Sequence, residues 1–276
     1  MANDIPLQKR SSILRKISNL MNKPSHERSK LIKIHTRRTI LRLFNYKPYF
    51  SNMFLSYQPD SQAVCNAYPE FNKLFKGFTR HNKVNNSGDI QRLWSFILNI
   101  SQIIDENIEG DFAELGVWRG NTASVLAHIA AKNNRQVYLF DTYEGFNKND
   151  IKGVDAGKDV TRFNNTSIEL VKDVIGPEAS CCHFVKGYFP ESLQEAHSLI
   201  KYAVVSLDCD LYEPMKAGLS FFYPLMSKGG IFLLHDYSSL QWAGAKQAID
   251  EFCKESGEFI ILMPDKSGSA FLRKSK

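Results

Sequence analysis

The amino-acid sequence predicts an α/β domain with a mostly parallel sheet, helices on both of its faces and one antiparallel edge strand. From Gly110 onward, short apolar segments alternate with amphipathic segments of helical period, which is typical of repeated strand–helix units. The segments expected to form strands are apolar throughout, as in strands buried on both faces. The last two have no helix between them, so they must form a hairpin, and this makes one edge strand antiparallel.

Seven strands are expected in this part of the chain: 111–116, 136–141, 182–187, 202–208, 231–236, 258–263 and 269–273. The helices expected between them are 121–133, 166–175, 191–200, 212–226 and 242–256. Pro190 suits the first position of the third helix, where no backbone N–H is needed. The apolar face of the fourth helix is expected to carry Met215, Leu219, Phe222 and Met226.

Three parts follow one another along the chain: a basic amphipathic arm (1–50), a cap region of helix and loop (51–108), and the α/β domain (109–276). In the cap region, Asp89 is placed to cap a helix whose apolar face holds Leu93, Phe96, Ile97, Ile100 and Ile104. The segment 146–165 is long for a strand-to-helix connection. We expect it, with parts of 51–88, to cover a bound ligand.

Charge is unevenly distributed along the 276 residues, of which 43% are hydrophobic and 23% charged. Residues 1–50 hold 12 Lys and Arg against two acids, a net charge of +10, so the other 226 residues carry 23 bases against 27 acids. The net positive charge of the chain therefore comes from the arm. The other 226 residues are slightly acidic, which argues against a basic nucleic-acid-binding domain. The arm itself could pack on its own domain or on a partner in a homo-oligomer, lie on an anionic membrane, contact nucleic acid, or be partly disordered.

The sequence also indicates where the protein works. No run of about 18 apolar residues is present, so no transmembrane helix is expected. The N-terminus carries charges every few residues and has no apolar core of a secretory signal. The five cysteines are odd in number and lack metal-type spacing, so we expect them to be reduced in a cytoplasmic protein.

A glycine-containing turn follows the first strand, in the sequence Glu114-Leu115-Gly116-Val117-Trp118-Arg119-Gly120-Asn121-Thr122. Glycines let the backbone approach a ligand, and the helix N-terminus that follows favours an anionic group. The second strand ends in Asp141, where an acid can bind ribose hydroxyls. This combination indicates a cofactor that carries a nucleoside, although the spacing does not match a dinucleotide-binding loop.

Acidic residues also end the fourth and fifth strands, in Asp208-Cys209-Asp210 and His235-Asp236. Residues i and i+2 of a strand share a face, so Asp208 and Asp210 can converge on one site. Two acids at the end of an apolar strand are unfavourable unless paired or bound to a cation. The pattern favours a divalent-metal and base site, with exposed loop acids as the alternative.

Four successive segments resemble the macrocin O-methyltransferase family: GDFAELGVWRGNTA, LFDTYEGF, VKGYFPESL and VVSLDCDLYEPMKAGLSFFYPLMSKGGIFLLHDY, within residues 88–256. The resemblance implies a Rossmann-like, seven-stranded class I methyltransferase with a helical N-terminal extension. It also implies use of S-adenosylmethionine to methylate a hydroxyl of a sugar or glycosylated small molecule.

The resemblance further implies roles for individual residues. Those assigned to the cofactor are Glu114, Gly116, Val117, Trp118, Arg119, Thr122, Asp141 and Thr142, with Asp141 at the ribose. Those assigned to a divalent metal, Mg²⁺ or Mn²⁺ or another transition metal, are Asp208, His235 and Asp236. Asp210 matches the family's general base.

His235 departs from the family pattern, which has an aspartate there. Imidazole suits zinc, manganese or iron better than magnesium. His235 could therefore bind a softer metal, leave its ligand position to water, or turn away and act as a second base. The competing functions are O-methylation of a phenol or catechol, and a cofactor-binding scaffold without catalysis.

Overall fold

The computed structural model describes residues 68 and 70–276. The basic arm (1–50), with the expectations attached to it, lies outside the described residues. Within residues 70–276, no helix is long and apolar enough to cross a membrane.

A seven-stranded sheet forms the centre of the described part, as predicted. Its strands are β1 (Asp111–Leu115), β2 (Val137–Asp141), β3 (Cys182–Lys186), β4 (Tyr202–Leu207), β5 (Met226–Leu234), β6 (Ile261–Leu262) and β7 (Ala270–Arg273). They lie in the order β3-β2-β1-β4-β5-β7-β6. The first five are parallel, whereas β7 runs antiparallel to both β5 and β6. The predicted hairpin is therefore present, and two-residue β6 forms the edge.

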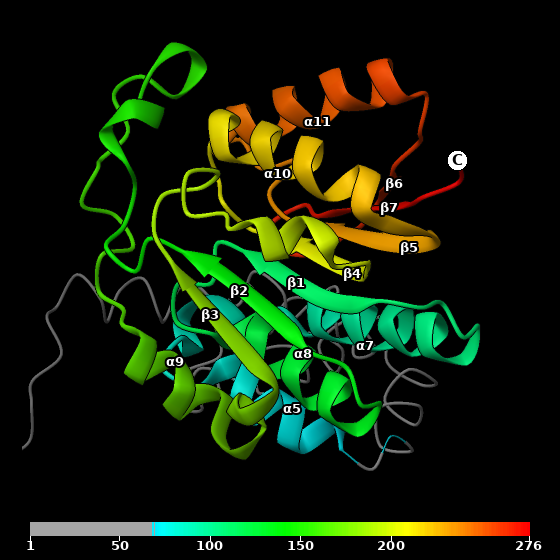
Figure 1. Ribbon diagram of the computed structural model, residues 1–276. Coiled ribbons are helices and arrows are strands. Elements are labelled where there is room, and N and C mark those ends of the chain that lie inside the picture. The colour runs from blue at the N-terminus through cyan, green and yellow to red at the C-terminus, as the bar shows by residue number, and fades with distance from the viewer. Residues whose placement is uncertain (1–67, 69) are drawn as a thin grey trace, which may run out of the picture. The chain divides into compact units, whose positions relative to one another are not determined.

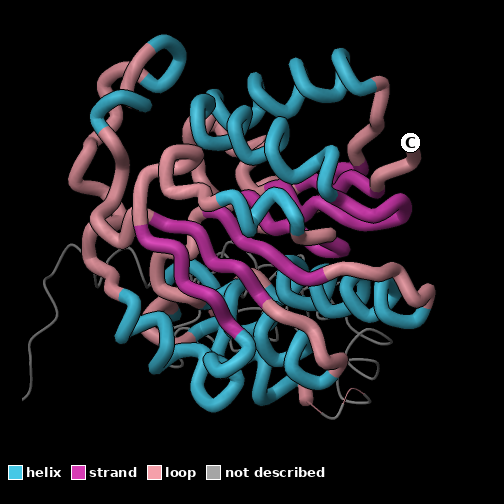
Figure 2. Tube along the Cα trace, viewed as in Figure 1, coloured by secondary structure: helices cyan, strands magenta, loops and turns pink. Residues whose placement is uncertain are grey.

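Helices cover both faces of this sheet (Figures 1 and 2). On one face lie α5 (Phe71–Thr79), α7 (Ile90–Asp105), α8 (Asn121–Lys132) and α9 (Ile168–Ile175), with short α6 (Lys83–Asn86) between α5 and α7. On the other lie α10 (Tyr212–Leu225) and α11 (Ala243–Ser256). Each face has its own buried apolar cluster, because strand side chains alternate between the faces.

Three local predictions differ from the structure. Residues 191–200 form only the 3-10 helix Glu195–Leu199, because the segment buries little apolar surface: Leu199 is 82% exposed. Met226 begins β5 instead of ending α10, since its backbone pairs with Tyr202. Asp89 stands at the N-cap of α7, but its side chain accepts a hydrogen bond from the backbone of Lys266 instead of capping the helix.

An ionic cluster joins α5, α8 and the 3-10 helix Gly176–Cys181. His128 is buried, with Nε2 2.9 Å from Glu70 Oε2 and Nδ1 3.0 Å from Glu178 Oε1. Glu178 also pairs with Lys73 at 2.5 Å. Burial opposes ionisation of Glu178, but hydrogen bonds from Lys73 and His128 outweigh it and lower its pKa to about 2.

Stability is expected to fall as the pH drops from about 4.5 to about 2. The pKa of Glu178 is lower in the folded protein than its unfolded value of 4.5, so ionised Glu178 stabilises the fold above pH 4.5. This stabilisation is lost as the pH falls toward 2. Between pH 4.5 and pH 2, the free energy of unfolding of Glu178→Gln should fall by about 1 kcal/mol less than that of the unmutated protein, allowing for solvent screening. Urea unfolding across this pH range measures it, with exposed Glu255→Gln as the control. An identical pH slope in Glu178→Gln and the unmutated protein would contradict the assignment.

Candidate active site

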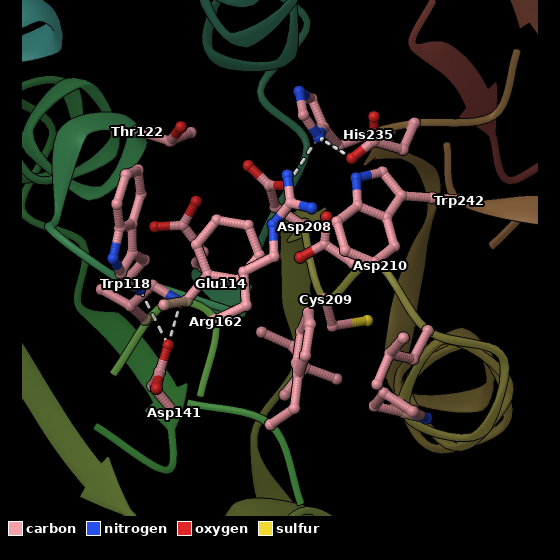
Figure 3. Close-up of a pocket in the computed structure, with 18 of the residues that line it drawn as sticks. Glu114, Trp118, Thr122, Asp141, Arg162, Asp208, Cys209, Asp210, His235 and Trp242 are labelled. Carbon is pink, nitrogen blue, oxygen red and sulfur yellow. Dashed lines mark hydrogen bonds and ion pairs between the residues drawn. The ribbon is translucent and has the colours of Figure 1, made fainter. Parts of the chain in front are cut away.

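A cavity of about 370 Å³ opens at the carboxyl ends of β1, β2, β4 and β5. This is where open α/β sheets bind ligands, and the volume is in the range of small-molecule sites. Figure 3 shows two halves: Trp118 and Asp141 lie on one side, and Asp208, Asp210 and His235 lie on the other.

The first half is built on the turn after β1. The Asp141 carboxylate accepts hydrogen bonds from the backbone N–H groups of Val117 (2.7 Å) and Trp118 (2.8 Å). Its other oxygen accepts from Tyr143 N at 2.6 Å. The acid at the end of β2 therefore fixes the glycine turn and also lines the cavity.

Glu114 lies at the base of the cavity and is 1% exposed. One carboxylate oxygen accepts from Ser206 Oγ at 3.3 Å, and the other has no hydrogen-bond partner among the described residues. Burial, and then the negative charge of Asp208, raise the pKa of Glu114 well above its usual value. An unpartnered buried carboxylate is unfavourable, so Glu114 fits a polar or cationic ligand group in this half.

Most residues predicted to bind the cofactor line this cavity: Glu114, Gly116, Val117, Trp118, Thr122, Asp141 and Thr142. Arg119 does not line it. Its guanidinium turns away and donates to the backbone oxygens of His81 (2.6 Å) and Asn165 (3.3 Å). Arg119 thus joins the turn to neighbouring loops.

Gly116→Ala is expected to weaken cofactor binding at least tenfold. Gly116 has φ +88°, and an added Cβ would lie 2.1 Å from the carbonyl oxygen of Asp208. The left-handed conformation alone costs about 1–2 kcal/mol for other residues, and the clash displaces backbone. Calorimetric titration with S-adenosylhomocysteine measures the effect. Gly153→Ala is the control, because Gly153 has φ +54° but open space around it; equal losses in both variants would contradict the steric explanation.

The second half brings Asp208, His235 and Asp236 together, as predicted. His235 Nδ1 lies 2.6 Å from Asp208 Oδ1 and 2.7 Å from Asp236 Oδ2. One ligand atom from each residue lies within 4.8 Å of the others. The Cys209 side chain, between the two acids that follow β4, belongs to the apolar core of the α10–α11 face.

The charges in this cluster are strongly coupled. Burial opposes ionisation of Asp208, but His235 holds the pKa of Asp208 below its usual value. Burial also works against the imidazolium, yet Asp208 and Asp236 raise the pKa of His235 well above the usual value. Burial and the nearby Asp236 raise the pKa of Asp210 well above that of a free aspartate. Asp208 and Asp236 therefore favour a positive charge beside them.

Backbone strain marks the same place. Asp210 and Asp236 have φ values of +61° and +59°, which are uncommon for residues other than glycine. Both are at least 90% buried. Such conformations persist only where the surroundings enforce them, and they occur often at active sites.

The donor set fits a divalent cation. Two carboxylates supply hard oxygen ligands, and an imidazole nitrogen is a common ligand of transition metals. Although His235 Nδ1 lies close to both carboxylates, it has no hydrogen-bond partner of suitable geometry among the described residues. A buried nitrogen between two anionic oxygens is the arrangement that a bound cation would stabilise.

Arg92 is a site residue that the sequence analysis missed. It is 6% exposed, lines the cavity, and places its guanidinium against His235 Nε2 and 3.7 Å from Asp208 Oδ2. It also donates to Asn86 Oδ1 at 3.0 Å. Its position at the first turn of α7 resembles that of many solvated arginines, so no sequence pattern distinguishes it.

Five residues of the segment 146–165 line the cavity: Phe146, Asn147, Asp150, Arg162 and Phe163. The Phe163 ring centroid lies 5.3 Å from that of Phe146 and 5.1 Å from that of Trp118. Trp242, at the start of α11, packs 5.6 Å from Phe146, and Arg162 lies 4.7 Å from its ring. These side chains give the cavity an aromatic wall, which suits the apolar face of a sugar ring.

The sheet order, the glycine turn and the acid at the end of β2 define a class I methyltransferase fold. The chain belongs to the macrocin O-methyltransferase (TylF) family, whose sequence model matches residues 28–262.

Curated relatives agree with this family. The chain is 26% identical over 177 residues to demethyldecarbamoylnovobiocin O-methyltransferase of Streptomyces niveus, covering 59% of this chain and 65% of that protein. It is 26% identical over 172 residues to mycinamicin III 3''-O-methyltransferase of Micromonospora griseorubida, covering 57% and 66%. The matches thus span slightly less than two-thirds of each relative's length.

Solved structures show the same fold. The O-methyltransferase NovP superposes with a TM-score of 0.57 at 24% identity, covering 68% of this chain and 81% of NovP. The calicheamicin methyltransferase CalS11 superposes with a TM-score of 0.58 at 22% identity, covering 91% and 94%.

Proposed function

We propose that this protein transfers a methyl group from S-adenosylmethionine to a hydroxyl of a sugar-containing small molecule. The observation that carries the proposal is one cavity with a glycine turn and an unpartnered Glu114 on one side and the Asp208–Asp210–Asp236 acids on the other. A curated relative from Streptomyces olivaceus is named as the 4'-O-methyltransferase of a rhamnosyl-tetracenomycin, and CalS11 is named as a TDP-rhamnose 3'-O-methyltransferase.

One half of the cavity would bind the cofactor, and the other would bind and deprotonate the acceptor hydroxyl. Gly116, Val117 and Trp118 hold the methionine end of the cofactor against Glu114, and Asp141 holds the ribose. S-adenosylmethionine, when bound, supplies an electrophilic methyl group on a sulfonium. Asp210 accepts the proton of the acceptor hydroxyl as the hydroxyl oxygen attacks the methyl carbon and the bond from that carbon to sulfur breaks. Holding the reactants in line provides much of the rate.

Asp208, Asp236 and His235 would hold a divalent cation beside Asp210. A bound cation polarises and orients a hydroxyl, which is a poor nucleophile at neutral pH. Arg92 adds a fixed positive charge at the same place. The aromatic wall of Phe146, Phe163 and Trp242 would contact the sugar ring of the acceptor.

A screen for methyl transfer tests the function. The full-length protein is incubated with S-adenosylmethionine and Mg²⁺ or Mn²⁺, and with nucleoside-diphosphate sugars, glycosylated aromatics and simple catechols as acceptors. Methylation of sugar hydroxyls supports the proposal, whereas methylation of catechols alone favours a phenolic O-methyltransferase. Tight cofactor binding without turnover on any acceptor would favour a scaffold.

The basic arm calls for a separate test. We propose membrane contact of residues 1–50 as one of the roles that the sequence leaves open, beside packing within the protein or a homo-oligomer, since 12 of them are Lys or Arg and apolar residues recur at helical spacing. Sedimentation with phosphatidylserine vesicles, compared between the full chain and a chain lacking residues 1–50, measures this contact. Equal partitioning would leave packing within a homo-oligomer as the alternative.

A further inference from the structure

Asp155 is a completely buried carboxylate in the segment that covers the cavity. It ends the 3-10 helix Gly153–Asp155 and is 0% exposed. It does not line the cavity. Burying a carboxylate is unfavourable unless hydrogen bonds compensate for the lost water, so its partners show what it does.

The carboxylate lies at the starts of two helices. Asp155 Oδ2 accepts from Tyr212 N, at the start of α10, at 2.7 Å. The carboxylate also lies against Gly244, near the start of α11, and its Oδ1 has no hydrogen-bond partner among the described residues. Gly244 allows the close approach, because a Cβ there would lie 2.1 Å from Oδ2.

Neither helix has a local cap. The N-cap residues are Leu211 for α10 and Trp242 for α11, and neither side chain makes a capping hydrogen bond. The first N–H groups of a helix need acceptors, and its N-terminus favours a negative charge. Asp155 provides an acceptor for α10 and places a carboxylate beside the starts of both 14-residue helices.

These two helices follow the two turns that carry the acid cluster. Asp208 and Asp210 lie between β4 and α10, and His235 and Asp236 lie between β5 and α11. Asp210 and Asp236 have strained left-handed backbones, so their side chains depend on surroundings that hold both turns in place.

We propose that Asp155 is a positioning residue that clamps both turns and couples the cover segment to the acid cluster. The expected loss of turnover rests on the proposed function, whereas the expected loosening of the two helix starts does not. When Asp155 is lost, the starts of α10 and α11 loosen and the spacing of Asp210 and Asp236 relaxes. The turn after β1 keeps its place, because Asp141 at the end of β2 holds it through backbone hydrogen bonds.

Hydrogen–deuterium exchange of the full chain tests the clamp without any substrate. In Asp155→Ala, peptides covering the starts of α10 and α11 and the segment 146–165 should exchange faster, whereas the turn after β1 should not change. Asp159→Asn is the matched control, because Asp159 is an exposed acid of the same segment that bonds only to Thr161. Unchanged exchange at both helix starts in a folded Asp155→Ala would overturn the proposal.

Steady-state kinetics test the catalytic consequence. Asp155→Ala should lower kcat at least tenfold with S-adenosylhomocysteine affinity unchanged, and Asp155→Asn, which keeps an acceptor oxygen, should recover part of the loss. Faster exchange with unchanged kcat would overturn the coupling to the acid cluster. Absence of turnover in the unmutated protein on every acceptor would count against the proposed function and leave the exchange result standing.

A double-mutant cycle identifies the contact with α11. Gly244→Ala should lower kcat and accelerate exchange in the unmutated background, because its Cβ meets Asp155. In the Asp155→Ala background the same change should have little further effect, because the clash is gone. Additive effects of the two changes would show that Asp155 does not act through Gly244.

Discussion

Asp210→Asn is expected to lower kcat by about 10²- to 10⁴-fold, the usual contribution of a general base. The side chain follows β4, is 8% exposed, and lies beside Asp236 and Asp208 in the acid cluster. Asparagine keeps the size of the side chain but cannot accept the proton of the acceptor hydroxyl. S-adenosylhomocysteine affinity should stay within about twofold, since the residues assigned to the cofactor lie in the other half of the cavity. Single-turnover kinetics and calorimetry measure the two quantities.

The control for this substitution is Asp250→Asn, which changes a half-exposed acid on α11 that pairs with Lys246. It should leave both turnover and cofactor affinity unchanged. Turnover of Asp210→Asn close to that of the unmutated protein would exclude Asp210 as the base. His235 would then be the nearest remaining candidate.

Removal of divalent metal is expected to lower turnover by more than 100-fold, with recovery when Mg²⁺ or Mn²⁺ is restored. The reason is that Asp208 and Asp236 bring two carboxylates to within 2.7 Å of one imidazole nitrogen, and a cation held there would polarise the acceptor hydroxyl. Metal content by mass spectrometry, before and after treatment with a chelator, accompanies the activity measurement. Full turnover in metal-free protein would mean that Arg92 and a protonated His235 supply the positive charge instead.

His235→Asp should shift the metal preference of this site toward magnesium. The change replaces an imidazole by a carboxylate, and magnesium strongly prefers oxygen ligands. Competition between Mg²⁺ and Mn²⁺, followed by calorimetry, measures the shift, and Asp208→Asn should weaken both metals. An unchanged ratio of the two affinities would show that His235 is not a ligand.

Most of the architecture follows from local patterns. Apolar strands such as Tyr202–Leu207 are buried along their whole length, so an apolar run is sufficient to predict them. The residues after the strands are equally predictable, because parallel strands place their carboxyl ends at one edge of a sheet. For this reason Glu114, Asp141, Asp208 and Asp236 could be assigned to one cavity from the sequence.

Other features depend on partners distant in the sequence. The segment 191–200 has helix-forming residues, but too little of it is buried to stabilise a full helix. Arg92 joins the site through His235, which lies 143 residues away. Asp155 joins two helix starts at Tyr212 and Gly244, and neither contact leaves a periodic signal along the chain.

The sequence by itself determined the strand–helix alternation, the family, and the acids that meet at the edge of the sheet, because these depend on residue type and on spacing within single elements. Only the tertiary structure decided that Asp141 holds the glycine turn, that Arg119 turns away, and that Arg92 and Asp155 support the acid cluster. These roles are set by which side chains meet across the fold, and the free energy of such contacts depends on burial and geometry that no local pattern encodes.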